Sequence, residues 1–447
     1  MFKRVLVANR GEIALRVIRA LKEMGIEPVA IYSEADEDAL YLRNAEETIC
    51  IGPAVSAQSY LDKRRIISAA EVANVDAIHP GYGFLSENAD FADICKSCKI
   101  VFIGPSSETI NMVGDKARAK ELAKEAGVPV IPGSDGIVEG DDELLRVAEE
   151  VGYPIMIKAS AGGGGRGMRI AHSELVLLKE YTAARNEAIA CFGDGRIYLE
   201  RYVDRPRHVE VQIMADSHGN IIHLGERDCS VQRRHQKLIE ESPCVAIDSD
   251  TRLAMGDAAV RLARAANYVN AGTVEFLLTQ DGEFFFMELN SRLQVEHPVT
   301  EMVTGVDLVK EQVRVAAGLP LSVTQDDIRI EGHSIECRIN AEDPDAGFRP
   351  CPGKVGLYVP SGGPGVRVDS HLFSGYSVPS HYDSMVAKLI VHRATREEAI
   401  DTMQRALEET VIDGIKTTIP LHQRILRHAG FRSGKIDTSF IEAEFSD

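Results

Sequence analysis

Acidic, amide and basic side chains alternate with apolar ones along residues 287–298, which read Met-Glu-Leu-Asn-Ser-Arg-Leu-Gln-Val-Glu-His-Pro. The polar positions recur at period two: Glu288, Asn290, Arg292, Gln294 and Glu296. In an extended segment, side chains two residues apart lie on the same face. A solvated strand face is the alternative, but such a face commonly carries Thr, Lys or Ser. Carboxylates beside a guanidinium suit a metal ion and an anion better.

The preceding residues supply a second carboxylate. Asp281-Gly282 separates two apolar runs, which predicts a β-hairpin with a two-residue turn. In that hairpin Glu275 lies directly opposite Glu288. The same register predicts the remaining pairs: Thr273 with Asn290, Val274 with Leu289, Phe276 with Met287, Leu277 with Phe286, and Leu278 with Phe285.

Like charges directly opposed on a sheet are destabilising. Two carboxylates held together therefore need a shared proton or a divalent cation. With Asn290 alongside, the ligands are all oxygen atoms, which favours Mg²⁺ or Mn²⁺ over zinc. We therefore predict a metal site formed by Glu275, Glu288 and Asn290. Arg292 beside this metal indicates a substrate that carries phosphate.

A glycine run indicates a second phosphate-binding element. Residues 162–165 are four consecutive glycines, and they follow a predicted strand that ends in Lys158. Backbone N–H groups of such a run can surround phosphate oxygens. It is not a P-loop, because no Gly-Lys-Ser/Thr follows. A flexible linker is the alternative, but the flanking Lys158 and Arg166 favour a mobile lid over phosphates.

Residues 225–237 concentrate five basic or histidine side chains: Arg227, Arg233, Arg234, His235 and Lys237. A solvated basic loop is the alternative to an anion-binding segment, and the neighbouring hairpin favours anion binding. The formal net charge of −18 argues against nucleic acid or an anionic membrane as the main partner. Only local clusters of positive charge can therefore serve an anionic substrate.

Strands and helices alternate at the start of the chain. The predicted elements are strand 4–8, helix 12–24, strand 29–32, helix 64–73, strand 77–79, helix 89–96 and strand 100–103. This alternation predicts a doubly wound parallel sheet. Ligands bind such sheets beyond the carboxyl ends of the strands, where residues 9–12 and 79–88 fall.

The 447 residues predict about three domains. We place an N-terminal domain at 1–114, a central domain at 115–330 with a smaller lid unit near 131–203, and a C-terminal mixed α+β domain at 331–447 that ends with helix 396–409. The fold class is α/β, or α+β overall. We expect a cytoplasmic protein with no membrane contact, because no apolar run reaches about 20 residues and the N-terminus is unlike a signal peptide. The eight scattered cysteines are expected to be reduced.

The whole chain resembles the biotin carboxylases, which are the ATP-grasp components of biotin-dependent carboxylases. The matching segments are 8–14 (Ala-Asn-Arg-Gly-Glu-Ile-Ala), 79–88 (His-Pro-Gly-Tyr-Gly-Phe-Leu-Ser-Glu-Asn), 153–158, 162–167, 207–210 (Arg-His-Val-Glu), 225–230 and 287–298. The resemblance implies that the central domain is an ATP-grasp domain. It also implies two steps: ATP and bicarbonate form carboxyphosphate, and the carboxyl group then moves to N1 of biotin.

The resemblance assigns roles to single residues. Catalysis falls to Glu296 as the base and to Arg292, Arg338 and Lys237. Nucleotide binding falls to Lys116, Lys158, Gly163, Gly164, Gly165, Glu200, Arg201, Tyr202, Val203, His208, Gln232, His235, Glu275 and Glu288. Leu277 shares the hairpin face of Glu275 and is placed against the purine. Bicarbonate falls to Lys237, Arg292, Gln294, the Val295 backbone and Glu296, and biotin to Tyr82 and Arg338.

The implied cofactors are two Mg²⁺ or Mn²⁺ ions, with ATP as substrate. We expect biotin to arrive on a separate carrier protein, carboxyltransferase subunits as further partners, and a homodimer. Acetyl-CoA carboxylase in fatty acid biosynthesis is the preferred assembly, with a split pyruvate carboxylase as the alternative. Another ATP-grasp ligase with an acyl-phosphate intermediate and a silent nucleotide-binding regulator also remain open.

Overall fold

The computed structural model describes residues 1–160 and 168–445. The predicted lid residues Gly163, Gly164 and Gly165 lie outside this described part, as does Arg166.

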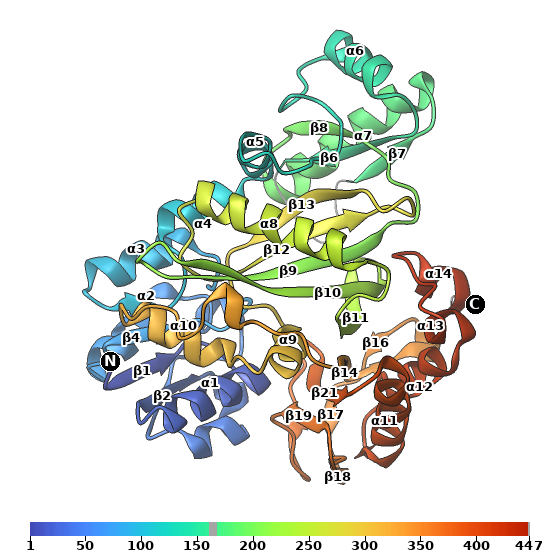
Figure 1. Cartoon of the computed structure of the whole chain (residues 1–447). Coiled ribbons are helices and arrows are strands. Elements are labelled where there is room, and N and C mark those ends of the chain that lie inside the picture. Colours follow the sequence, from blue (N-terminus) through green and yellow to red (C-terminus); the bar gives the residue numbers. More distant parts are fainter. Residues whose placement is uncertain (161–167, 446–447) are drawn as a thin grey trace.

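The N-terminal region forms the predicted parallel sheet (Figure 1). Its strands are β1 (Arg4–Val7), β2 (Glu27–Tyr32), β3 (Glu47–Cys50), β4 (Ala77–His79) and β5 (Val101–Phe102), in the spatial order β3-β2-β1-β4-β5. The helices are α1 (Gly11–Glu23), α2 (Lys63–Val72) and α3 (Ala89–Ser97). Sequence reasoning missed β3, whose Glu-Thr-Ile-Cys stretch is short and half exposed.

Alternation along β1 explains why helices cover both faces of this sheet. Val5 and Val7 pack in one core with α1, whereas Leu6 packs in another core with α2 and α3. Successive strand side chains point to opposite faces, so a short strand that is apolar throughout must be covered on both sides. The doubly wound arrangement is therefore confirmed.

A smaller unit stands apart at the top of the molecule (Figure 1). Its elements are α6 (Asp141–Val151), β6 (Ile155–Ala159), β7 (Arg169–Ala171), α7 (Glu174–Phe192) and β8 (Ile197–Arg201), and the strands form the antiparallel order β7-β6-β8. It follows α4 (Ser107–Gly114) and α5 (Lys116–Glu125), which connect it to the N-terminal sheet. Asp115 caps α5 by accepting hydrogen bonds from the backbone of Ala117 and Arg118.

The largest sheet has eight antiparallel strands, in the order β13-β12-β9-β10-β11-β14-β21-β19. They are β9 (Arg207–Ala215), β10 (Ile221–Arg233), β11 (Gln236–Ser242), β12 (Asn270–Leu278), β13 (Phe284–Asn290), β14 (His333–Asn340), β19 (Val366–Ser370) and β21 (Met385–Arg393). Because β14, β19 and β21 continue the sheet, the division we placed at residue 330 passes through one structural layer.

Further helices cover this sheet and its C-terminal end: α8 (Ser249–Ala265), α9 (His297–Thr304), α10 (Leu308–Ala316), α11 (Arg396–Glu409), α12 (Ile419–Arg427), α13 (Ala429–Arg432) and α14 (Phe440–Phe445). Short strands complete the C-terminal region: β15 (Glu342–Asp343), β16 (Arg349–Pro350), β17 (Gly353–Lys354), β18 (Tyr358–Val359), β20 (Ser377–Val378) and β22 (Val411–Ile412). In the described ranges, 3₁₀ turns lie at 34–36, 40–44, 56–58, 325–327 and 344–346. In the described residues, no helix has the length and apolarity needed to span a bilayer.

The turn of the β12–β13 hairpin is one residue longer than predicted. The Thr279 N–H donates to the Glu283 carbonyl at 2.8 Å, so residues 280–282 form the loop. Gly282 adopts a φ of 85°, a conformation that favours glycine. The predicted pairs next to the turn are therefore wrong, and the observed pairs are Phe276 with Phe286, Leu277 with Phe285, and Leu278 with Phe284.

A β-bulge cancels this error before the site is reached. The register shifts by one between Glu275 and Phe276, which leaves Met287 without a partner. Beyond the bulge, Glu275 lies opposite Glu288 as predicted. Thr273 with Asn290 and Val274 with Leu289 are likewise confirmed.

Candidate functional site

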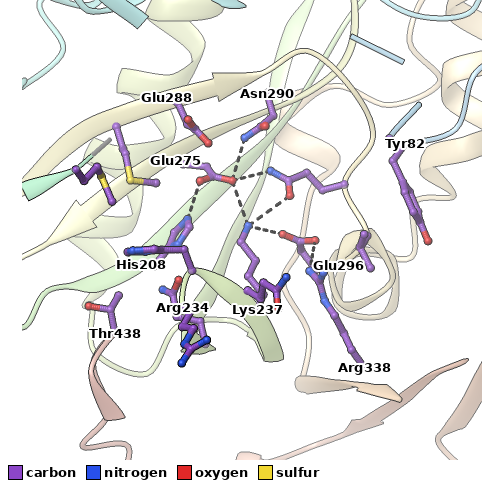
Figure 2. A pocket seen from close by; sticks show the side chains of 18 of the residues that line it. Tyr82, His208, Arg234, Lys237, Glu275, Glu288, Asn290, Glu296, Arg338 and Thr438 are labelled. Atoms are coloured by element: carbon purple, nitrogen blue, oxygen red, sulfur yellow. Dashed lines mark hydrogen bonds and ion pairs between the residues drawn. The ribbon is translucent and has the colours of Figure 1, made fainter. Parts of the chain in front are cut away.

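One cleft of about 1260 Å³ is lined by every predicted site residue that lies in the described part of the chain (Figure 2). These residues come from the N-terminal loops, the smaller unit, the central sheet and β14: Tyr82, Lys116, Lys158, Glu200, Arg201, Tyr202, Val203, His208, Gln232, His235, Lys237, Glu275, Leu277, Glu288, Asn290, Arg292, Gln294, Val295, Glu296 and Arg338. Residues that are far apart in sequence are thus brought together around one cleft.

Lys237 lies in the middle of the side chains that line this cleft (Figure 2). Its Nζ is 2.5 Å from Glu210 Oε2, 2.5 Å from Glu296 Oε1 and 3.1 Å from Glu275 Oε1. Burial would lower the pKa of this ammonium, but the surrounding anionic groups raise it well above its ordinary value. Lys237 is therefore a fixed positive charge among three carboxylates.

Glu275 accepts hydrogen bonds from several directions. Asn290 Nδ2 lies 2.9 Å and Gln294 Nε2 lies 2.8 Å from Oε1, while His208 Nε2 is 2.8 Å from Oε2. Burial opposes ionisation, but Lys237 and His208 outweigh it and hold the pKa of the Glu275 carboxyl well below its usual range. Glu275 is therefore ionised, and its proximity raises the pKa of His208.

Glu296 connects Lys237 to a second cation. Its side chain is fully buried, and its Oε2 lies 2.9 Å from Arg338. Despite burial, Lys237 and Arg338 hold the pKa of the Glu296 carboxyl well below its ordinary value. Arg338 is itself anchored from behind by Glu240 Oε1 at 2.5 Å. The carboxylate therefore lies between the predicted bicarbonate and biotin ligands.

The residues after β13 form a loop that connects it to α9. β13 ends at Asn290 and α9 begins at His297, so residues 291–296 are irregular. Their alternation therefore does not mark a strand. Arg292 Nε bonds to Glu87 Oε2 at 2.9 Å, which ties this loop to the N-terminal 79–88 segment.

Three lysines lie toward the smaller unit, each paired with a carboxylate. Lys158 Nζ is 2.5 Å from Glu200, and Lys120 is 3.0 Å from the same carboxylate. Lys116 Nζ lies 3.4 Å from Glu288. Sequence reasoning missed Lys120, which lies on α5 one helical turn after Lys116, a spacing that places both side chains on one face.

The basic segment 225–237 forms a hairpin instead of an open loop. β10 and β11 are joined by Arg234 and His235, which have φ values of 47° and 65°. Positive φ at both positions is typical of a tight type I′ turn. The turn presents both side chains to the cleft.

Two buried residues lie beneath the site: Glu210, which sequence reasoning missed, and Arg227, which was placed in an anion-binding segment but pairs with Glu210 instead. Glu210 is completely buried, faces Glu275 across β9 and β12, and contacts Lys237. Arg227 is also completely buried and donates to Glu210 Oε1 at 2.6 Å, as well as to Gln212, Thr273 and Thr300. Glu210 could have been found by period two, because His208 precedes it by two residues on β9.

The donor set fits a hard divalent cation. Glu275 and Glu288 are opposed across adjacent strands, Asn290 lies beside Glu275, and all three line the cleft. Their oxygens are the ligand type that Mg²⁺ and Mn²⁺ prefer. His208, Glu210 and Glu275 also bring potential ligand atoms within 4.8 Å of one another, and Glu275 belongs to both sets.

Three family models match the chain. The biotin carboxylase N-terminal domain matches residues 1–110, the ATP-binding domain of the carbamoyl-phosphate synthase L chain matches 115–324, and the biotin carboxylase C-terminal domain matches 336–443.

Curated relatives agree in length and order. The chain is 56% identical to biotin carboxylase of Nostoc sp. over 99% of both proteins. It is 55% identical to biotin carboxylase 1 of Bacillus subtilis, over 99% of this chain and 98% of the relative. It is 54% identical to a pyruvate carboxylase subunit from Methanothermobacter thermautotrophicus, over 99% of this chain and 90% of the relative.

Solved structures are equally similar. Biotin carboxylase of Campylobacter jejuni, in complex with an ATP analogue, superimposes with a TM-score of 0.96 at 51% identity over 99% of both chains. The biotin carboxylase domain dimer of Hydrogenobacter thermophilus 2-oxoglutarate carboxylase, in complex with MgADP, ADP and bicarbonate, gives 0.94 at 50% identity over the full length of both.

Proposed function

Because this chain belongs to the biotin carboxylase family, we propose that it carboxylates biotin on a separate carrier protein as the first half-reaction of an acetyl-CoA carboxylase. ATP-dependent carboxylation of biotin is the activity of the family. Carboxyphosphate as intermediate, the carrier-bound form of biotin, the final acceptor and the residue roles below are parts of the proposal.

The first step transfers the γ-phosphoryl group of ATP to bicarbonate, giving carboxyphosphate and ADP. The side chains of Lys116, Lys158 and His235 donate hydrogen bonds to phosphate oxygens, and the two lysines offset the negative charge that spreads over them. Mg²⁺ or Mn²⁺, held as two ions by Glu275, Glu288 and Asn290, would supply further charge neutralisation when bound.

The adenosine part of ATP has its own wall in the cleft. Residues 200–203 line the adenine, Leu277 packs against the purine, and His208 contacts the ribose near Gln232. All of these side chains line the same cleft as the phosphate-binding cations. The nucleotide is thereby oriented with its phosphates toward Lys237 and Arg292.

Bicarbonate becomes a nucleophile when Glu296 accepts its proton. Lys237, Arg292, Gln294 and the Val295 N–H bind the anion and hold it near the γ-phosphorus. The planar guanidinium of Arg292 matches the bidentate geometry of bicarbonate. The strongest support is the position of Glu296, which contacts Lys237 on one side and Arg338 on the other.

Carboxyl transfer forms a bond between N1 of biotin and the carboxyl carbon of carboxyphosphate and breaks the bond from that carbon to the phosphate oxygen; phosphate leaves and takes the N1 proton. Arg338 stabilises the negative charge that develops on the ureido oxygen, and Tyr82 contacts the ring. A fixed guanidinium in a water-poor site is effective because it needs no reorganisation when the charge appears. Glu240, which anchors Arg338, keeps that guanidinium in place.

The final acceptor is proposed as acetyl-CoA, in fatty acid biosynthesis, with pyruvate as the alternative. Similarity to separate biotin carboxylases supports the first, and nearly the same identity to a protein of a pyruvate carboxylase supports the second. Reconstitution with carrier and carboxyltransferase subunits distinguishes them by the product formed. The dimer of the Hydrogenobacter protein supports a homodimer, and we also propose a cytoplasmic location.

Steady-state ATP hydrolysis tests the proposed reaction. We expect hydrolysis to require bicarbonate and to increase when free biotin is added. Another ATP-grasp ligase would cleave ATP without regard to either compound, and a silent regulator would bind ATP without cleaving it. Turnover that is independent of bicarbonate and biotin would therefore refute the assignment.

A further inference from the structure

Lys388 is a buried cation that the proposed reaction does not yet use. It lies on β21 with its side chain 0% exposed, between Arg338 on β14 and Asp369 on β19 in the ladder. Burial would lower the pKa of this ammonium, but neighbouring carboxylates, led by Glu12, raise it. An ammonium without access to water is costly unless it is paired, so its contacts indicate what it does.

The ammonium contacts two parts of the cleft wall. Lys388 Nζ donates to the Val295 carbonyl at 2.8 Å and lies 3.2 Å from Glu12 Oε1 on α1. Glu12 is buried and accepts a hydrogen bond from the Tyr82 hydroxyl. The ammonium also lies 5.9 Å from the centroid of the Tyr82 ring, within the range of a cation–π interaction.

We propose that Lys388 is a positioning residue that fixes the 291–296 loop through the Val295 carbonyl, and that Glu12 links this loop to Tyr82. The inference rests on the proposed function, in which the loop binds bicarbonate and Tyr82 contacts biotin. Lys388 touches neither substrate.

The geometry explains why such an anchor is needed. The Val295 carbonyl belongs to the peptide unit that directly precedes Glu296, and peptide units are planar. A hydrogen bond to this oxygen therefore fixes the backbone from which the Glu296 side chain departs. The loop is irregular, so its orientation depends on contacts with rigid elements, and β21 is paired on both sides in the sheet, with β14 and β19.

Through Glu12, Lys388 is connected both to Tyr82, which is proposed to contact biotin, and to the loop that is proposed to bind bicarbonate. Tyr82 belongs to the N-terminal region, Val295 to the loop after β13, and Lys388 to the C-terminal region. Displacement of Tyr82 changes the environment of the Glu12–Lys388 pair, and that pair holds the loop. Biotin at Tyr82 is thereby coupled to the geometry of the bicarbonate loop.

Lys388→Met removes the donor while keeping side-chain volume. We expect the KM for bicarbonate in ATP hydrolysis to rise about 10- to 100-fold, because a small displacement of a reacting group has effects of that size. The stimulation by free biotin should fall several-fold, whereas the KM for ATP should stay within about twofold. Lys63→Met, which removes a surface pair with Asp90, serves as the matched control.

In the single variant, the KM could change because the loop loses its anchor or because Glu12 is left as an unpaired buried carboxylate. The double variant Lys388→Met with Glu12→Gln distinguishes these two effects. It removes both charges and keeps an acceptor for Tyr82, so it also serves if the single variant does not fold. A bicarbonate KM that stays raised supports the inference, and a wild-type KM in the double variant overturns it. If the wild-type protein hydrolyses ATP only with bicarbonate but Lys388→Met shows unchanged constants, the inference fails while the proposed function stands.

Discussion

Lys237 Nζ lies 2.5 Å from Glu296 Oε1 in a buried pair. The pair joins the end of the β10–β11 hairpin to the loop that precedes α9. Because Lys237 also contacts Glu210 and Glu275, one ammonium balances three carboxylates. Its loss would leave like charges close together in a region with little access to water.

Lys237→Gln should therefore impair the bicarbonate step most. We expect kcat/KM for bicarbonate to fall about 10²- to 10³-fold, the usual effect of removing one stabilising donor from a reacting site. The measurement is ATP hydrolysis as a function of bicarbonate. Lys22→Gln, which removes a surface pair with Glu46, should match the wild type. An unchanged kcat/KM in Lys237→Gln would exclude this residue from bicarbonate binding.

Arg338→Gln should separate the two half-reactions. Arg338 contacts Glu296, but its proposed charge partner is the ureido oxygen of biotin. We expect biotin carboxylation to fall about 10²-fold or more, with a loss of less than about tenfold in bicarbonate-dependent ATP cleavage. Both rates are measured on the same preparation, as ADP release and as carboxybiotin formed. Equal losses would show that Arg338 only maintains the structure.

Local patterns predicted much of the fold and the site. The pairing of Glu275 with Glu288 was predicted from alternating apolar residues on either side of a turn that contains glycine. Both signals lie within about fifteen residues. The apolar strands of the N-terminal sheet were also predicted from local patterns, because strands and helices alternate along that part of the chain. Even so, the three predicted pairs next to the turn were wrong, because the longer loop and the bulge at Met287 cancel each other and neither has a signal in the pattern.

Long-range neighbours could not be predicted in this way. Glu210 and Arg227 acquire their partners only because β9 lies between β12 and β10, a sheet order that alternation does not reveal. Lys388 gave only a weak signal, as a single lysine within the apolar run 385–391 of β21. Its contacts with Val295 and Glu12 depend on three distant parts of the chain.

Glu288→Gln should weaken the response to metal. Glu288 is one of two opposed carboxylates, and an amide is a poorer ligand for Mg²⁺ than a carboxylate. We expect the Mg²⁺ concentration that half-saturates ATP hydrolysis to rise about tenfold or more. Glu283→Gln, on the exposed turn of the same hairpin, is the control. A normal Mg²⁺ requirement in Glu288→Gln would argue against Glu288 as a ligand.

Arg227→Met should reduce stability. The guanidinium is completely buried and donates to Glu210, Gln212, Thr273 and Thr300. Removing one member of a buried charged network costs about 3–5 kcal/mol, because the remaining groups lose their partner. Thermal unfolding should show a clearly lower midpoint. The exposed Arg146→Met, on α6, should change stability by less than about 0.5 kcal/mol, and a similar shift in both variants would contradict the prediction.

Glu241 should make folding stability sensitive to acid. Its carboxylate accepts hydrogen bonds from His333 at 2.9 Å and Arg396 at 2.6 Å. Burial would raise the pKa of the Glu241 carboxyl, but these partners outweigh it and lower the pKa to about 2. The ionised form is therefore favoured in the folded chain. The contribution of the ionised Glu241 carboxylate to the free energy of unfolding is complete above about pH 4.5. It declines as the pH falls toward 2, by about 3 kcal/mol in total.

Glu241→Gln isolates this effect, since the amide cannot ionise. We expect the variant to have a lower free energy of unfolding than the wild type at pH 7. The difference between the two free energies should become smaller below pH 4.5. Urea unfolding followed at a series of pH values measures both. A difference that stays constant from pH 7 to the acid limit of the folded protein would show that the carboxylate of Glu241 does not contribute through its charge.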